Sequence, residues 1–89
     1  MENRIQNKKL IAIGEALIDF IPEQAGCAIK DVAAFLPAVG GAPANVCGAF
    51  TKLGGRSEMI TQLGEDGFGD KILETFQNAG IGSSYVKRT

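Results

Sequence analysis

The sequence predicts an α/β fold built on a parallel sheet. Short apolar runs typical of strands alternate with segments that repeat apolar residues at helical spacing, in the order strand, flap, helix, strand, helix. Such alternation favours parallel strands joined by right-handed crossovers. The 89 residues, of which 45% are hydrophobic, allow one small globular unit.

The first two strands are predicted from apolar runs near the amino terminus. Residues 9–13 form an almost continuous apolar run followed by Gly14, which is typical of a central strand buried on both faces. Residues 17–21 form a second run that contains Asp19 and stops at Pro22. Proline cannot donate into a strand ladder, so we expect a short strand that leaves the sheet.

The middle of the chain predicts a flap and then a helix. Residues 32–39 are apolar but broken by Pro37, which indicates an edge strand or an irregular flap. A helix is expected from Pro43, a residue suited to a first helical turn, up to Gly54-Gly55. Its apolar stripe would consist of Val46, Ala49, Phe50 and Leu53.

The last third predicts a strand, a helix and the beginning of another strand. The strand covers residues 57–63, and Asp66 is the candidate N-cap of a helix that Gly80 ends. The apolar face of this helix would consist of Phe68, Ile72, Leu73, Phe76 and Ala79. Residues 85–88 look like the opening of a further strand. Two or three parallel strands with open edges seldom stand alone, so we expect these residues to be part of a larger domain.

Composition argues against several classes of partner and site. The net charge is −1 without a basic cluster, so we expect neither a nucleic-acid nor a membrane partner. The run at residues 10–13 is too short for a signal peptide or a membrane span, which predicts a cytoplasmic protein. Cys27 and Cys47 are therefore expected to be thiols. No histidine is present, so chemistry here would use carboxylates, amides, hydroxyls and backbone groups.

Two features could bind a polyhydroxylated ligand. The segment from Gly40 to Asn45 pairs glycines, which let backbone approach a ligand, with an amide that both donates and accepts hydrogen bonds. Asp19 could accept hydrogen bonds from two adjacent hydroxyls. The alternatives are a plain loop-to-helix connection for the glycine pair and a solvent-facing strand position for Asp19.

A second glycine-rich segment, residues 64–70, could be mistaken for a phosphate-binding loop. It lacks the Lys-Ser or Lys-Thr ending of a P-loop, and it does not follow the first strand as a dinucleotide-binding turn does. Its three acidic residues would repel phosphate. We therefore expect this segment to supply a turn and a helix cap.

Three stretches together resemble the ribokinase-like, PfkB-type carbohydrate kinases. They are Gly14-Glu15-Ala16-Leu17-Ile18-Asp19-Phe20, Gly40-Gly41-Ala42-Pro43-Ala44-Asn45-Val46 and Leu63-Gly64-Glu65-Asp66-Gly67-Phe68-Gly69. Within the family, the first two are most similar to fructokinases. Ala42 stands where ribokinases proper tend to carry lysine, which argues against ribose as the substrate. The resemblance implies a ribokinase-like parallel sheet flanked by helices, of which only the amino-terminal part is present.

The resemblance also implies roles for particular residues. Asp19, Gly41 and Asn45 correspond to contacts with sugar hydroxyls, and residues 17–22 and 32–39 to a small β-lid that forms a homodimer interface in many relatives. The complete enzyme would transfer the γ-phosphoryl group of ATP, with Mg²⁺, to fructose.

The family's Gly-Ala-Gly-Asp signature, which holds the catalytic base, does not occur here. We therefore expect no catalytic residue in these 89 residues and no kinase activity from them alone. Two alternatives stay open: a kinase for ribose, 2-keto-3-deoxygluconate or adenosine, and a non-catalytic sugar-binding or assembly module.

Overall fold

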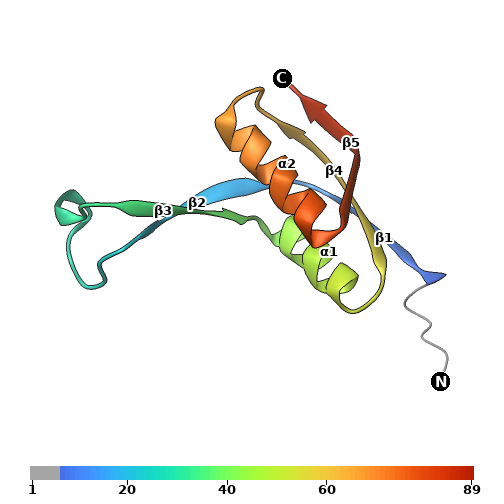
Figure 1. The fold of residues 1–89 in the computed structure, drawn as a ribbon, viewed down its shortest axis with the longest axis horizontal. Helices are drawn as coiled ribbons and strands as arrows, with labels where there is room; N and C mark the ends of the chain where they lie inside the picture. Colours follow the sequence, from blue (N-terminus) through green and yellow to red (C-terminus); the bar gives the residue numbers. More distant parts are fainter. Residues whose placement is uncertain (1–6) are drawn as a thin grey trace.

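The computed structural model describes residues 7–89, and it has the predicted α/β architecture (Figure 1). Its elements in chain order are β1 (Lys9–Ile13), β2 (Leu17–Pro22), the short 3-10 helix η2 (Ile29–Asp31), β3 (Phe35–Gly40), α1 (Ala42–Lys52), β4 (Arg56–Leu63), α2 (Gly67–Ala79) and β5 (Ile81–Arg88). The strands form two sheets. One is a parallel sheet of three strands and the other an antiparallel hairpin of two.

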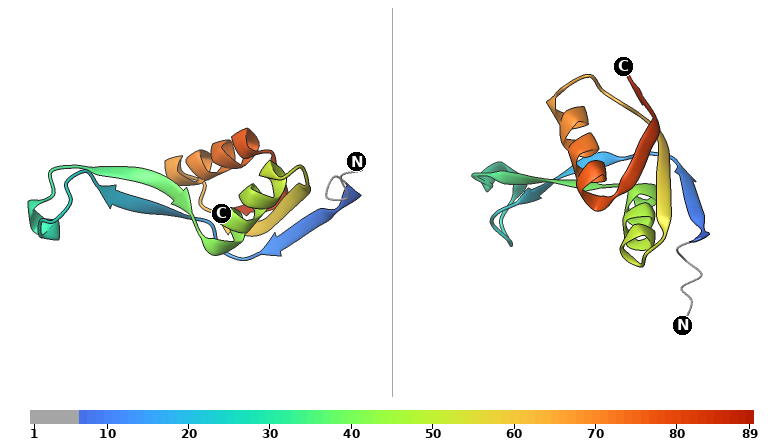
Figure 2. Two further views of the ribbon diagram at one scale, coloured as in Figure 1. Left: turned by 90° about the horizontal axis from the view of Figure 1, so that it is seen from below. Right: turned by 45° about the vertical axis from the view of Figure 1, so that its right-hand side comes forward.

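The parallel sheet has the strand order β1-β4-β5, and both helices lie on the same face of it (Figure 2). Each successive strand is added on the same side of the last, so right-handed crossovers bring α1 and α2 to one face. Within residues 7–89, β1 pairs with β4 alone, and Ile11 and Ile13 are exposed on the face without helices. These residues by themselves therefore do not bury β1 on both faces, and its place as a central strand stays a prediction for the larger domain.

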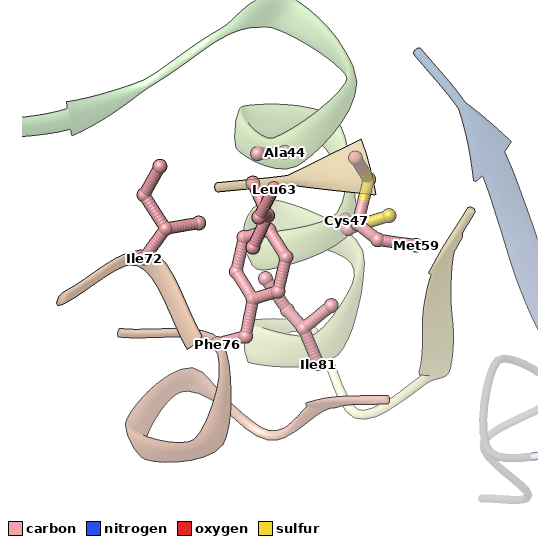
Figure 3. Packing of buried hydrophobic residues seen from close by; sticks show 7 residues of the cluster. All are labelled: Ala44, Cys47, Met59, Leu63, Ile72, Phe76 and Ile81. Atoms are coloured by element: carbon pink, nitrogen blue, oxygen red, sulfur yellow. The ribbon is translucent and has the colours of Figure 1, made fainter. Parts of the chain in front are cut away.

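The core fills the space between the helices and the sheet (Figure 3). Its buried members are Ala44, Cys47, Met59, Leu63, Ile72, Phe76 and Ile81. The stripe predicted for α1 is wrong, because α1 buries the small side chains of Ala44 and Cys47, whereas Val46 and Leu53 are exposed. Small side chains let a helix lie close to the sheet. They therefore occupy the contact face although larger apolar residues were available.

Both cysteines are free thiols, as predicted. Cys27 is exposed and Cys47 is buried in the core. Desolvation by burial raises the pKa of the Cys47 thiol, and hydrogen bonds from Ser57 and the Ala12 backbone oppose this effect. A thiol in this environment stays protonated at neutral pH and serves as a small apolar core group.

Helix α2 begins and ends where its capping residues predict. The Asp66 carboxylate accepts a hydrogen bond from the Gly69 backbone N–H at 2.8 Å, which confirms Asp66 as the N-cap. Gly80 ends the helix in the left-handed conformation, with φ of 75°. The buried residues of α2 are Gly69, Ile72 and Phe76, while Phe68 lies outside the core.

The antiparallel hairpin formed by β2 and β3 extends away from the sheet and helices (Figure 1). Leu17 pairs with Gly40 at its base and Pro22 pairs with Phe35 farther out. The predicted flap at residues 32–39 thus becomes a strand that starts only at Phe35 and includes Pro37. A two-stranded ribbon tolerates proline because both of its strands are edges.

Strand β5 is longer than predicted, starting at Ile81 directly after the α2 cap. It pairs with β4 as far as Arg88 opposite Leu63. Among the helices of residues 7–89, none combines the length and the apolar character needed to cross a membrane.

Candidate functional site

Asp19 meets the glycine pair at the base of the hairpin. A Cβ atom at position 40 would lie only 2.5 Å from Oδ2 of Asp19, so the carboxylate occupies the space that a side chain at Gly40 would fill. Asp19 sits on β2 opposite Ala38, and its side chain leans toward the carboxyl end of β3. Glycine at position 40 is therefore a condition for the carboxylate to lie there.

Gly41 joins the hairpin to α1 in a backbone conformation that favours glycine. Its φ is 106°, and a Cβ atom there would lie 2.8 Å from the Glu15 carbonyl oxygen. The turn at residues 40–41 is therefore packed directly against the backbone that leaves β1. A Cβ at Gly14 would in turn meet Pro43 Cγ at 2.7 Å, so the first turn of α1 lies beside the end of β1.

Asn45 lies in the first turn of α1, and its backbone N–H donates to the Gly41 carbonyl at 3.0 Å. Its side chain lines a pocket of about 250 Å³ between α1 and α2. The other lining residues are Val39, Ala44, Gly48, Ala49, Thr75, Phe76, Ala79 and Ile81. Asp19 and Gly41 do not line this pocket. Asp19 therefore lies beside the glycine pair, whereas Asn45 lies about one helical turn farther along the chain.

The polar side chains of this region are available to a ligand. Within residues 7–89, neither the Asp19 carboxylate nor the Asn45 amide takes part in a side-chain hydrogen bond. Both residues are exposed. They lie near the carboxyl end of β1, and ligands of open α/β sheets bind outside the carboxyl ends of strands. A carboxylate acceptor and an amide that both donates and accepts suit a ligand with several hydroxyl groups.

The second glycine-rich segment has a structural task. Besides the Asp66 cap, the Arg88 side chain donates from Nε to the Gly64 carbonyl at 3.0 Å and pairs with Asp70 at 2.7 Å. These contacts tie the end of β5 to the start of α2. They match the turn and cap roles expected from the sequence.

The part of the chain that the structure describes offers no group of three or more acidic, cysteine or histidine side chains that could hold a metal ion.

Sequence reasoning missed three contacts in this region. The Glu15 carbonyl oxygen faces Gly41, and the Asp19 carboxylate occupies the space beside Gly40. Phe20 on β2 packs edge-to-face on Phe68 of α2. The sequence signal for this pair was that each Phe stands next to a glycine or an acidic residue of a motif. That signal could not predict the contact, because the contact depends on where the hairpin folds.

Comparison with known proteins places the chain in a family. Residues 7–89 match the model of the pfkB family carbohydrate kinases. The chain is 43% identical over 77 residues to the probable fructokinase-5 of Arabidopsis thaliana, covering 86% of this chain and 24% of that protein.

Solved structures show the same likeness. The ATP-bound fructokinase of Xylella fastidiosa matches with a TM-score of 0.80 and 39% identity over 92% of this chain and 26% of that one. The aminoimidazole riboside kinase of Salmonella enterica, solved with its riboside and an ATP analogue, matches with a TM-score of 0.77 and 31% identity over 91% of this chain and 25% of that one. The chain thus spans about a quarter of the length of these proteins. With a ribokinase-like sheet and a family match over residues 7–89, the chain belongs to the pfkB family of carbohydrate kinases.

Proposed function

We propose that these residues form the sugar-binding portion of an ATP-dependent fructokinase. The observation that carries the proposal is the placement of the exposed Asp19 carboxylate, which makes no side-chain hydrogen bond within residues 7–89, beside Gly40 and the turn into α1. The likeness to the Arabidopsis and Xylella fructokinases favours fructose among the sugars.

In this proposal, Asp19 accepts hydrogen bonds from two neighbouring hydroxyls of the sugar. Gly41 presents backbone at close range, and the Asn45 amide provides a donor and an acceptor from the first turn of α1. Together these groups would orient the hydroxyl that receives the phosphoryl group, because positioning supplies much of the rate enhancement in phosphoryl transfer. The catalytic base and the nucleotide site would lie outside these 89 residues.

ATP is the proposed phosphoryl donor, as the Xylella fructokinase and the Salmonella kinase were solved with ATP or its analogue. A bound Mg²⁺ would neutralise charge on the transferring phosphates. Residues 7–89 offer no acidic cluster for it, so we assign its ligands to other parts of the full-length kinase.

A substrate panel on the full-length kinase tests this function. We expect fructose to be phosphorylated with a higher kcat/KM than ribose, 2-keto-3-deoxygluconate or adenosine, and the 89 residues alone to be inactive. The riboside kinase among the similar structures makes a nucleoside substrate the second candidate. Higher efficiency on a nucleoside would replace fructose in the proposal, and sugar binding without phosphoryl transfer by the full-length protein would favour a non-catalytic module.

We also propose that the hairpin serves as a lid and as a homodimer interface. It exposes a set of large apolar side chains consisting of Leu17, Phe20, Ile21, Ile29, Phe35 and Leu36. A ribbon this apolar and this exposed is typical of an interaction surface.

Light scattering tests the dimer. We expect the full-length protein to have the mass of a dimer and the double variant Ile21→Asp, Leu36→Asp, which changes a directly paired couple of the hairpin, to have the mass of a monomer. The matched variant Leu53→Asp, at the exposed residue that directly follows α1, should remain dimeric. A wild-type monomer would refute this interface.

A further inference from the structure

The hairpin is held to the rest of the molecule at few points. Ile18 and Val39 near its base are partly buried against the core, but residues 19–31 are exposed throughout. Beyond Ile18, the aromatic contact between Phe20 and Phe68 links β2 to α2. The two ring centroids lie 5.8 Å apart with an interplanar angle of 89°, which is the favoured edge-to-face geometry.

Phe68 lies in a part of the chain whose backbone is held by several contacts. The residues around it are fixed by the Asp66 cap on Gly69 and by the ion pair between Asp70 and Arg88. Position 69 packs so closely that a Cβ atom there would lie 2.0 Å from the Gly64 carbonyl oxygen. The Phe68 ring therefore rests on a well-held backbone, even though 55% of the residue's surface is exposed.

The contact between the Phe20 and Phe68 rings also affects the position of Asp19, the residue before Phe20. Consecutive residues of a strand point to opposite faces, so Phe20 faces α2 while Asp19 faces the other side of β2. Asp19 and Gly40 lie on the paired strands of this hairpin, so the pairing itself keeps the carboxylate beside Gly40. Loss of the ring contact would let the whole hairpin swing and move the Asp19 carboxylate relative to Asn45 on α1.

We propose that Phe68 is a positioning residue that acts through Phe20 to hold the hairpin, and with it Asp19, in place relative to Asn45 on α1. Its consequence for sugar affinity rests on the function proposed above, whereas its effect on the hairpin does not.

Amide hydrogen exchange on the full-length kinase tests the mechanical part. In Phe68→Leu, which keeps an apolar side chain but removes the ring edge, we expect exchange in β2 and β3 to accelerate roughly two- to tenfold while β4 stays unchanged. Phe68→Tyr should restore the wild-type exchange rates, and Leu53→Ala, an exposed change directly after α1, should not alter them.

Two results would overturn this role: unchanged exchange in the hairpin, or equal acceleration in all strands. The kinetic arm uses the same full-length kinase, in which Phe68→Leu should raise the KM for fructose severalfold and leave the KM for ATP unchanged. An unchanged fructose KM beside a loosened hairpin would refute the positioning of Asp19. A wild-type kinase inactive on fructose would instead refute the proposed function, and the exchange result would still decide the role of Phe68.

Discussion

Replacing Asp19 by alanine in the full-length kinase is expected to lower kcat/KM for fructose by roughly 5- to 150-fold. A lost hydrogen bond to a charged group costs about 1 to 3 kcal/mol, and a sugar that loses this contact also presents its hydroxyl less well to the phosphoryl donor. The KM for fructose should therefore rise and kcat should fall. Steady-state kinetics with fructose as the varied substrate measure both effects.

Asp31 provides the matched control for this substitution. It is also an exposed aspartate of the hairpin region, but it lies on η2 far along the ribbon from the glycine pair. Asp31→Ala should leave kcat/KM within twofold of the wild type. Asp19→Asn keeps an acceptor but loses the charge, so it should fall between wild type and Asp19→Ala. Equal kinetics for wild type and Asp19→Ala would remove Asp19 from the site.

Gly69→Ala is expected to lower the free energy of unfolding by about 3 kcal/mol, near the upper end of the usual cost of overpacking. The added Cβ would lie 2.0 Å from the Gly64 carbonyl oxygen, which is backbone and cannot rotate away. Relief would require the β4–α2 loop to move, breaking the Asp66 cap and the Arg88 contacts. Urea unfolding followed by circular dichroism should show a midpoint lower by about 2 M.

The same helix offers a control two residues earlier. A Cβ at Gly67 would meet no heavy atom within 4 Å, and alanine is a better helix former than glycine by about 1 kcal/mol. Gly67→Ala should thus leave the stability unchanged or raise it slightly. If the two variants unfold at the same urea concentration, the tight contact at Gly69 does not exist in solution.

Local signals predicted much of the fold. Asp66 and Gly80 mark the two ends of α2, because a carboxylate cap and a left-handed glycine act within one helical turn. The strands β1, β2 and β4 follow from short apolar runs. The motif glycines were predicted to form the turn before α1, and the structure has them there. Their steric reasons, a carboxylate at Gly40 and a carbonyl at Gly41, come from segments more than twenty residues earlier and required the structure.

The sequence by itself determined the α/β class, the helix caps and the residues of the glycine-to-asparagine turn, because each depends on neighbours in the chain. Only the tertiary structure decided that β1 lies at an edge of the described sheet, that α1 buries Ala44 and Cys47, and that Phe20 meets Phe68. These outcomes depend on which surfaces of distant elements fit together. Apolar spacing along the chain specifies that a face will be buried, but shape complementarity between elements selects the face.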